Sequence, residues 1–386
     1  MKIGLASPIS CYHFREYLYP ESAIIAEKLS ENYAPSVTNL AIDFLKRGHA
    51  LVVFTEDPAT SRRCILKGPS LTIYVVPTIH VGWRRVLNKL HINDFRLICA
   101  MRRYREPLDI MSVHWTRDFA VGARSYLGLC PVTVTVRDII PLVSKMQRIS
   151  WVTKLWTEIT MHNDRFHFIA NSDYTRDMIK CFWRKESTVI YNGVSDLFLD
   201  YHFEDKYEAY TFVSITVSIT ERKNISKLME AFKEVHNQNP NTRLVLIGPM
   251  FIDTNPFVKE WKNTGLSKGV VFAGSKTRRE IKSILTKSHC LVHPSLEETF
   301  GNILIEAMAC KCLVIGGKDA GAVPYVLKMG ERGILCDVTD VKSLACSMNR
   351  AIHDDYSELI NNAFTAVIGE YSGEKICSDY ISYFSQ

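Results

Sequence analysis

The chain lacks several features that would place it in a specialised class of protein. None of its apolar runs approaches the length of about 20 residues that a membrane-spanning helix needs. Residues Met1 to Pro8 hold one lysine and a short apolar run, so we expect a first strand there and no signal peptide. The 11 cysteines show no paired spacing, and Cys310 and Cys312 lie too close together for a zinc pattern. We therefore expect a cytoplasmic protein with free thiols.

Acidic residues are scarce in one segment, although the net charge of the whole chain is only +6. Residues 84–105 contain seven lysines and arginines but one aspartate, and their apolar residues recur at helical spacing. A second basic stretch, Ser144 to Trp156, carries two tryptophans. Either segment is compatible with binding to an anionic membrane leaflet, and equally with a solvated surface helix.

Short apolar runs alternate with helical patterns, which predicts βα repeats and parallel sheets. A length of 386 residues exceeds what one hydrophobic core usually serves, so two domains are expected. The polar segment from Asp196 to Tyr210 shows no periodicity and is the predicted linker. The strands predicted before it are Ile3–Ala6, Ala50–Thr55, Leu71–Val76, Ile110–Val113, Val132–Val136, Phe166–Ala170 and Val189–Tyr191.

The same pattern restarts after the predicted linker. Its strands are expected at Phe212–Thr216, Arg243–Ile247, Val270–Phe272, Cys290–His293, Leu313–Ile315 and Gly333–Leu335. Its helices are expected at Ile225–Asn237, Thr277–Ser288, Gly301–Ala309 and Val341–His353. The last stretch, Glu374 to Phe384, is amphipathic and predicts a helix that can pack on either domain.

The strongest local signal is HPSLEETFGNILIEAMA, His293 to Ala309, where an apolar strand runs into an acidic turn and then a helix. Ligands of open parallel sheets bind beyond the carboxyl ends of the strands, where helix N-termini present amides to anions. Glu298 lies in the turn and Glu306 in the helix, so both carboxylates can face one ligand, such as a nucleotide sugar with its vicinal hydroxyls. Taken alone, the two acids are equally explained as a helix-dipole acid and a solvated helix residue.

A second junction between a strand and a helix carries two adjacent cations. The strand ends near Ser218, and Arg222 and Lys223 precede an apolar periodic helix. An arginine fork and a lysine point charge suit a diphosphate. An isolated pair of this kind is more often an ordinary exposed pair, but two such turns in one half of the chain favour a binding site.

These motifs resemble glycosyltransferase family 4, a large group of retaining enzymes with the GT-B fold that includes enzymes of bacterial envelope polysaccharide synthesis. The matching stretches are ERKN at Glu221–Asn224, LVLIGP at Leu244–Pro249, VFAGS at Val271–Ser275, PSLEETFGNILIEAMA at Pro294–Ala309 and AGAVPYVL at Ala320–Leu327. Weaker similarity in the first half extends the resemblance over nearly the whole chain. It implies an α/β protein with two Rossmann-like, doubly wound parallel-sheet domains that face a central cleft.

The resemblance also assigns parts of the chain and residues to roles. It implies an acceptor-binding domain at 1–197, a nucleotide-sugar domain at 198–365 and a C-terminal helix at 366–386 that can pack back on the first domain. Arg222 and Lys223 would hold the donor diphosphate, Glu298 the sugar hydroxyls and Glu306 the ribose. The other donor-binding positions are Ser218, Gly248, Thr299, Phe300, Gly301, Asn302 and Ile303, and the acceptor-side positions are His114, Arg137 and Asp138.

The chain departs from the family pattern near both substrates. The stretch Asn32 to Leu40, where many members have a glycine-rich loop, contains no glycine. The usual His-Asp pair reads Arg137-Asp138, so the role of that histidine does not transfer. His114 fits either an acceptor contact or a satisfied core histidine. Where many members have an arginine, the chain has Val217-Ser218-Ile219, and Arg222 is the expected substitute.

The predicted function is retaining transfer of a sugar from a UDP- or GDP-sugar to a glycan or lipid-linked acceptor. No Asp-x-Asp motif stands at a suitable strand end, so no metal or other cofactor is expected, and Arg222 and Lys223 would take the place of a divalent ion. Attack on the same face of the sugar needs no protein nucleophile.

Two alternatives stay open. One is a catalytically silent binding subunit. The other is a dinucleotide-dependent oxidoreductase, although SPISC rather than a G-x-G-x-x-G motif follows the first strand. The expected location is the cytoplasm, with peripheral contact at the inner face of the cytoplasmic membrane as a further option, and no nucleic-acid partner is expected.

Overall fold

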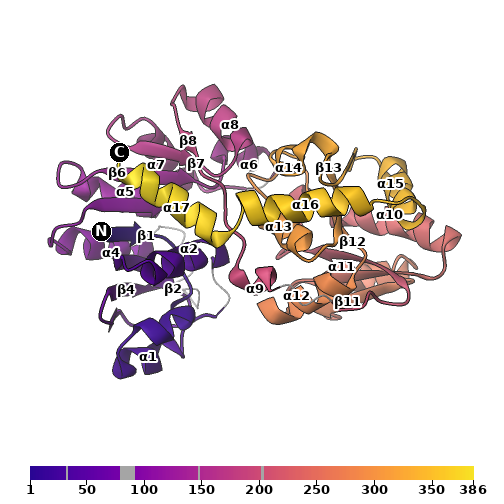
Figure 1. Cartoon of the computed structure of the whole chain (residues 1–386), viewed down its shortest axis with the longest axis horizontal. Helices are drawn as coiled ribbons and strands as arrows, with labels where there is room; N and C mark the ends of the chain where they lie inside the picture. Colours follow the sequence, from indigo (N-terminus) through magenta and orange to yellow (C-terminus); the bar gives the residue numbers. More distant parts are fainter. Residues whose placement is uncertain (32–33, 79–91, 147, 201–203) are drawn as a thin grey trace. The chain divides into compact units, whose positions relative to one another are not determined.

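The computed structural model describes residues 1–386 except 32–33, 79–91, 147 and 201–203, and the chain divides into two compact units. Unit 1 comprises Met1–Gly193 and Gly373–Gln386, and unit 2 comprises Val194–Ser372. These boundaries differ from the predicted 197/198 and 365/366 because α9 (Asp196–Leu199) and α16 (Ser357–Glu370) both pack on helices of unit 2. Figure 1 labels the elements of both units.

Unit 1 is built on an eight-stranded sheet in the order β3-β4-β2-β1-β5-β6-β7-β8. All neighbouring strands are parallel except β3, which pairs antiparallel with β4. Its strands are β1 Lys2–Ala6, β2 Ala50–Asp57, β3 Cys64–Lys67, β4 Leu71–Pro77, β5 Ile110–His114, β6 Val132–Val136, β7 His167–Ala170 and β8 Thr188–Val189. Its helical elements are η1 Cys11–Tyr17, α1 Pro20–Ala26, α2 Pro35–Lys46, α4 Ile92–Arg103, α5 Asp118–Ala123, η2 Arg124–Tyr126, α6 Ile140–Met146, α7 Trp151–Met161, α8 Asp173–Trp183 and α17 Gly373–Phe384.

The continuous apolar runs become the strands because both faces of this sheet are buried. Alternate residues of a strand point to opposite faces. Leu51 and Val53 of β2 accordingly belong to one hydrophobic cluster, whereas Val52 and Phe54 belong to the other. The sheet therefore separates two cores within unit 1.

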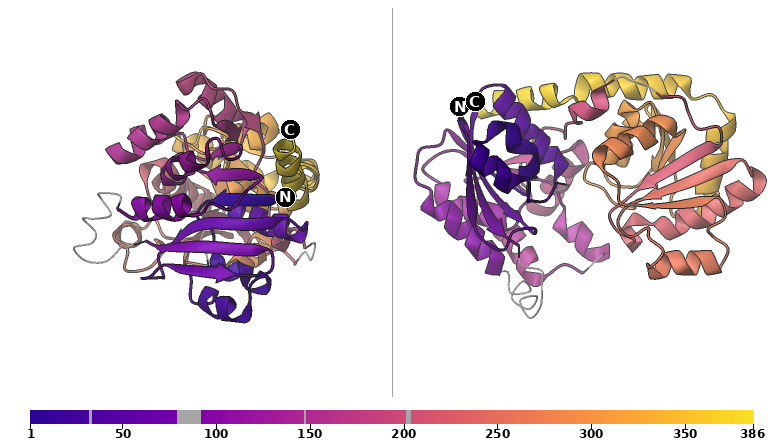
Figure 2. Two further views of the ribbon diagram at one scale, coloured as in Figure 1. Left: turned by 90° about the vertical axis from the view of Figure 1, so that its left-hand side faces the viewer. Right: turned by 90° about the horizontal axis from the view of Figure 1, so that it is seen from below.

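The C-terminal helix α17 completes one of these cores. Ile376, Cys377 and Tyr380 are 3%, 0% and 1% exposed. The ring of Tyr380 meets Phe44 of α2 edge-on with centroids 6.2 Å apart, and its hydroxyl lies 3.1 Å from the Thr135 hydroxyl of β6. Both ends of the chain thus lie in unit 1, as Figure 2 shows.

Unit 2 is built on a six-stranded sheet in the order β11-β10-β9-β12-β13-β14, in which all neighbours are parallel. Its strands are β9 Tyr210–Ile215, β10 Thr242–Ile247, β11 Val270–Gly274, β12 Cys290–His293, β13 Leu313–Gly317 and β14 Ile334–Cys336. Besides α9 and α16, its helical elements are η3 Glu221–Lys223, α10 Ile225–Gln238, α11 Pro256–Asn263, α12 Arg278–Lys287, α13 Asn302–Ala309, α14 Val323–Val326, η4 Lys328–Gly330 and α15 Val341–His353.

Every predicted strand is present to within two residues at each end, but two features need correction. The strand β3 was not predicted, because its four residues are too few to carry a clear alternation. The linker prediction is wrong in its described part: Phe198 is 1% exposed, and Lys206 donates a 2.6 Å hydrogen bond to the carbonyl of Ser288. The described residues of this stretch therefore belong to unit 2, and the chain passes from unit 1 to unit 2 before it, at Gly193/Val194.

The first basic segment, 84–105, is described only in part. Residues 84–91 lie outside the described residues, and α4 covers Ile92–Arg103. Leu97, Ile98 and Met101 on this helix are 1%, 5% and 0% exposed. Its described apolar side therefore packs inward on its own unit. Within the described ranges, no helix is both long enough and apolar enough to cross a bilayer.

Candidate functional site

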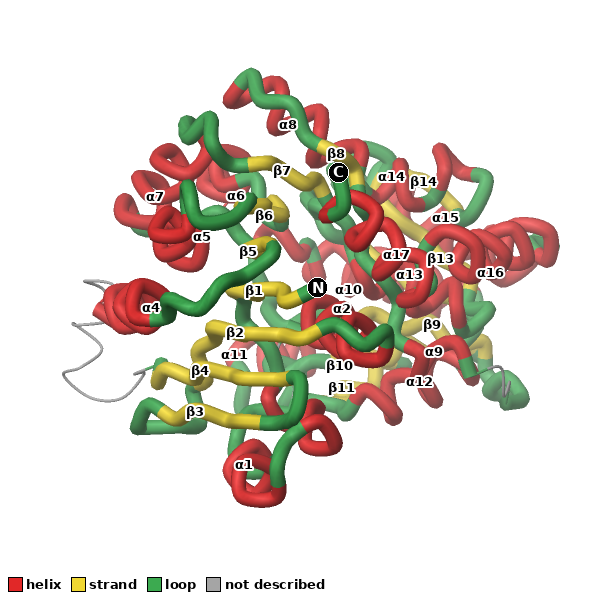
Figure 3. Tube along the Cα trace, turned by 60° about the vertical axis from the view of Figure 1, so that its left-hand side comes forward, coloured by secondary structure: helices red, strands yellow, loops and turns green. Residues whose placement is uncertain are grey.

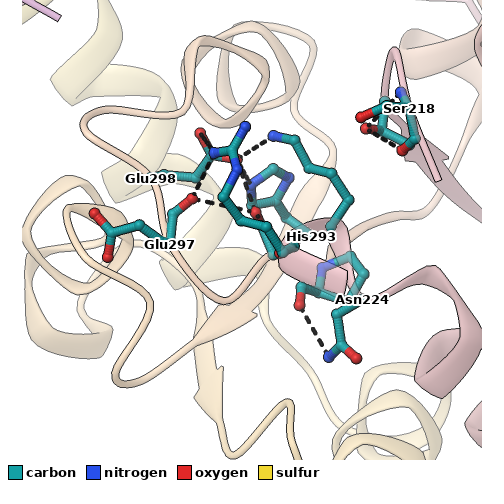
Figure 4. A network of polar contacts seen from close by, with 10 residues as sticks. Ser218, Asn224, His293, Glu297 and Glu298 are labelled. Carbon is teal, nitrogen blue, oxygen red and sulfur yellow. Dashed lines mark hydrogen bonds and ion pairs between the residues drawn. The ribbon is translucent and has the colours of Figure 1, made fainter. Parts of the chain in front are cut away.

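Two loops of unit 2 meet at the carboxyl ends of neighbouring strands. Because β9 pairs with β12, the turn that contains Arg222 and the turn that contains Glu298 start side by side. The amide of Leu296 donates a 2.8 Å hydrogen bond to the carbonyl of Arg222. The side chain of Asn224 donates to the carbonyls of Pro294 and Val338 at 3.2 and 2.8 Å. These hydrogen bonds fix the two turns against each other, and Figure 4 shows Asn224 within the polar network.

A charged cluster lies where these turns meet. The ammonium of Lys223 is 2.5 Å from Oε1 of Glu298, and Nη1 of Arg222 is 3.9 Å from Oε2 of the same carboxylate. Arg222 Nη1 also donates a 2.9 Å hydrogen bond to the carbonyl of Glu297. The side chains of Lys223 and Glu298 are each 14% exposed. Two cations and one carboxylate are therefore held in a mostly buried group that still reaches the surface.

The carboxylate of Glu298 has two further neighbours. Ser295 donates a 2.9 Å hydrogen bond to Oε1, and Nε2 of His293 lies 3.3 Å from the same atom. Burial alone would raise the pKa of Glu298, but the charge of Lys223 and the ring of His293 more than offset it and hold that pKa far below its usual range. Glu298 is thus a fixed negative charge at neutral pH.

Sequence reasoning gave no role to His293 and Ser295. Both belong to the motif that drew attention to Glu298, and the position of His293 as the last residue of β12 was the available signal. Figure 4 shows the side chains of His293 and Glu298 close together and Ser218 apart from them. Ser218 is held by its own turn, in which the Thr216 hydroxyl donates a 3.2 Å hydrogen bond to the Ser218 carbonyl.

The loop after β13 contacts the turn that contains Glu298. The amide of Ala322 donates a 2.8 Å hydrogen bond to the carbonyl of Glu298. Gly321 has φ +62°, and a Cβ there would lie 2.4 Å from the Glu298 carbonyl oxygen. Only glycine permits this approach, so the predicted AGAVPYVL motif acts here by positioning the backbone of Glu298.

The helix α13 begins directly after the same turn. Gly301, its N-cap, has φ +85°, and a Cβ there would come within 3.0 Å of the Leu304 side chain. The ring of Phe300 is buried against Tyr371 with centroids 5.8 Å apart. Thr299, Asn302 and Ile303 are partly exposed around this start. A helix N-terminus with its positive dipole end therefore lies beside Glu298.

Glu306 occupies an environment that the sequence did not reveal. Its carboxylate is gripped by Arg278 of α12 through two hydrogen bonds, Nη2 to Oε1 at 2.7 Å and Nη1 to Oε2 at 3.0 Å. The guanidinium of Arg278 also lies 4.7 Å from the ring centroid of Phe198. The Glu306 side chain is 7% exposed. A ligand that binds this carboxylate must share it with Arg278 or displace it.

Gly248 holds two strand-end loops close together. It follows β10 with φ +149°, and a Cβ there would lie 1.8 Å from the carbonyl oxygen of Thr216, which follows β9. The close approach of these two backbones requires glycine. The residue therefore shapes the loop that carries Ser218.

The predicted acceptor-side residues form a separate polar group in unit 1. Nε of Arg137 donates to Nδ1 of His114 at 3.1 Å, and Nη1 donates to the side-chain oxygen of Asn192 at 2.6 Å. His114 and Arg137 are 0% and 8% exposed, and Asp138 is half-buried. Trp115, which follows β5, has φ +71°, and the Arg137 guanidinium lies 5.6 Å from its ring. Arg137 thus links the ends of β5 and β6 to Asn192.

Two family models together match most of the chain. The model described as Glycosyltransferase Family 4 matches residues 34–196, and the model described as Glycosyl transferases group 1 matches residues 203–365. The chain is similar to the N-acetyl-alpha-D-glucosaminyl L-malate synthase of Bacillus anthracis, with 24% identity over 301 residues that cover 72% of this chain and 74% of the relative. It is 33% identical over 107 residues to the gpi3 subunit of the phosphatidylinositol N-acetylglucosaminyltransferase of Schizosaccharomyces pombe, a match that covers 27% of this chain and 23% of that relative.

Solved structures share the fold over the full length of the chain. Sucrose-phosphate synthase from Thermosynechococcus elongatus gives a TM-score of 0.77 at 16% identity, covering 100% of this chain and 98% of the other. The Anabaena protein HepE, solved in complex with UDP and glucose, gives 0.68 at 17% identity and covers 100% of both chains. The predicted fold class, with two parallel-sheet α/β domains of the GT-B type, is confirmed.

The buried His114 predicts a pH dependence of folding stability. Burial and, second, the charge of Arg137 lower the pKa of His114 well below its usual 6.5. Below about pH 6.5 the His114 side chain binds a proton in the unfolded chain but not in the folded one, so the stability that His114 contributes is lost as the pH falls, by about 1.4 kcal/mol at pH 5.5. Other histidines with lowered pKa values, such as His49 and His289, remain in the variant, so we expect urea unfolding to show a larger loss at low pH in the wild type than in His114→Asn, which can still accept from Arg137. Equal pH slopes for the two proteins would refute the assignment.

Proposed function

We propose that this chain, which belongs to glycosyltransferase family 4 and is therefore a glycosyltransferase, moves a sugar from a UDP- or GDP-sugar to a glycan or lipid-linked acceptor. The transfer retains the configuration of the sugar. The observation that carries this proposal is the group of Arg222, Lys223 and Glu298 beside the start of α13. The UDP and glucose named for HepE, which shares the fold, support a donor of this class. Family membership contradicts the oxidoreductase alternative.

The donor would lie across the carboxyl ends of β9 and β12. Arg222 and Lys223 would bind the diphosphate, and Glu298, as a permanently ionised acceptor, would bind the sugar hydroxyls. The N-terminus of α13 would add its amides to the phosphate site. Glu306 would bind the ribose, in which case the hydroxyls compete with Arg278 for its oxygens.

The reaction follows from where charge develops. As the bond between the anomeric carbon and the diphosphate oxygen breaks, its electron pair passes to the diphosphate, and the two cations stabilise the growing negative charge without rearranging. The acceptor oxygen attacks on the same face, and its proton passes to the departing phosphate. No protein nucleophile and no divalent ion is needed in this scheme.

The acceptor would bind in unit 1 near Arg137. A buried guanidinium at the ends of β5 and β6 favours an acceptor that carries an oxyanion or several hydroxyls. The names of two relatives mention L-malate and phosphatidylinositol, and both of these molecules are anionic. We place the reaction in the cytoplasm, at the inner face of the cytoplasmic membrane when the acceptor is lipid-linked.

Replacing Lys223 should abolish most of the turnover. We expect Lys223→Ala to lower kcat by about 100-fold to 1,000-fold, because the charge that stabilises the leaving diphosphate is lost. Release of nucleotide from the sugar nucleotide is the measurement. Lys227→Ala, an exposed lysine on the next helix, is the matched control and should keep full activity. If the wild type binds the nucleotide but shows no turnover, the chain is instead a catalytically silent binding subunit.

Chelation should leave the enzyme active. In this scheme Arg222 and Lys223 neutralise the leaving group, so the initial rate with excess EDTA should equal the rate in untreated protein. Loss of activity with EDTA that Mg²⁺ or Mn²⁺ restores would show that a metal ion takes part.

Nucleotide affinity should depend on Glu306. We expect Glu306→Gln to weaken binding of the matching nucleoside diphosphate about tenfold, because a charge-assisted hydrogen bond to the ribose is lost. Isothermal titration calorimetry measures this directly, with the exposed Glu230→Gln as control. Unchanged affinity would reject the ribose role and leave Glu306 as the structural partner of Arg278.

A further inference from the structure

The helix α7 presents two large apolar side chains to solvent. Trp151 and Leu155 are 74% and 46% exposed, and their spacing of four residues places them on one face of the helix. The opposite face holds Thr153, Thr157 and Thr160, which are 9%, 0% and 0% exposed. A helix at a water-facing surface normally buries its apolar face and exposes its polar one. In α7 three threonines are buried while a tryptophan and a leucine are exposed beside the charged Lys154 and Glu158.

The inward threonines belong to a well-packed interior. The hydroxyl of Thr157 lies 3.2 Å from that of Thr116, and the amide of Thr153 donates a 3.0 Å hydrogen bond to the N-cap Ser150. The helix packs on α5 and α6, and Figure 3 shows it beside them. The orientation of α7 is therefore fixed by contacts on its inner side, and the outward position of Trp151 is not the result of a loose helix.

Cations precede the exposed face of α7 in the sequence, and one acid, the exposed Glu158, lies on that face seven residues after Trp151. Residues 139–157 contain three lysines and arginines and no aspartate or glutamate. These cations, Lys145, Arg148 and Lys154, are all exposed. An exposed tryptophan and leucine, with three exposed cations within six residues of Trp151 in the sequence, match the interface of an anionic lipid leaflet, where the ring enters the headgroup region and the cations meet phosphates.

The other basic segment, 84–105, does not combine exposed cations with large exposed apolar side chains in its described part. On α4 the apolar residues Leu97, Ile98 and Met101 are buried in unit 1. Within residues 96–103, the part of this helix whose side chains are described, the exposed arginines Arg102 and Arg103 have no large exposed apolar side chain beside them. Of the two basic segments, the one that spans α6 and α7 combines exposed cations with large exposed apolar side chains in its described residues, as a membrane-binding surface requires.

We propose that the surface formed by α6 and α7, with Trp151 and Leu155 at its centre, docks unit 1 on an anionic membrane leaflet. The helix α6 starts at Ile140, three residues after Arg137 of the candidate acceptor group. A leaflet bound here lies next to the acceptor-side residues along the chain, so the acceptor of the proposed reaction is a lipid-linked one. This last step rests on the proposed function, whereas the docking itself does not.

The test is co-sedimentation of the full chain with vesicles, without substrates. We expect binding to vesicles of phosphatidylcholine with phosphatidylglycerol, and little binding to phosphatidylcholine alone. The double variant Trp151→Ala/Leu155→Ala should lower the partition coefficient at least about tenfold, and Lys145→Gln/Arg148→Gln/Lys154→Gln should lower it on anionic vesicles specifically. The matched control is Ile24→Ala/Ile25→Ala on α1, an exposed apolar pair beside Glu21 and Glu27, which should bind like the wild type.

Release of nucleotide from the sugar nucleotide, measured without lipid, separates this proposal from the proposed function. The double variant should keep the wild-type rate, which also shows that it folds. Equal vesicle binding by wild type and double variant would overturn the docking proposal and leave the proposed function standing. A double variant that turns a dimer into a monomer in sedimentation velocity without changing vesicle binding would instead assign this face to a second copy of the chain.

Discussion

The ion pair between Lys223 and Glu298 is the contact on which the candidate site depends. It joins two turns that are 75 residues apart in sequence and neighbours only because β9 pairs with β12. The contact is mostly buried, so removal of Lys223 would leave the more distant Arg222 to balance the carboxylate of Glu298 in a poorly solvated place. The backbone hydrogen bonds between the two turns hold the pair in register.

Positioning of charge in unit 2 relies on small residues as much as on charged ones. Gly321 and Gly248 allow loops to approach Glu298 and Thr216 more closely than any Cβ would permit. The charged residues of the site therefore stand on turns whose shape is set elsewhere. A substitution at either glycine would move the charges without touching them.

Much of the fold was predictable because the strands are buried on both faces and their apolar runs are continuous. Arg222, Lys223 and Glu298 were predictable because they follow such runs directly. The pairing of Glu306 with Arg278 was not, since Lys276, Arg278 and Arg279 are equivalent in sequence and only the cap at Thr277 sets which of them faces α13. The outward face of α7 was also hidden, because periodicity shows that a helix has two faces and not which one packs. The contact of Asn192 with Arg137 was not predictable, since the two residues are 55 positions apart in sequence.

Two neutral acceptors, His114 and Asn192, bind the buried Arg137 in unit 1. His114 accepts through Nδ1, so its ring proton resides on Nε2, and the low pKa of this histidine preserves that state. A protonated ring would have no lone pair for Arg137. The neutral imidazole and the buried cation thus require each other.

Because α17 belongs to the core of unit 1, the whole of unit 2 is an insertion between two parts of one domain. During synthesis the ribosome delivers all of Val194–Ser372 before Tyr380 exists to fill its place against Phe44. Unit 2 can therefore fold before α17 takes its place in unit 1, although most of unit 1 is translated first.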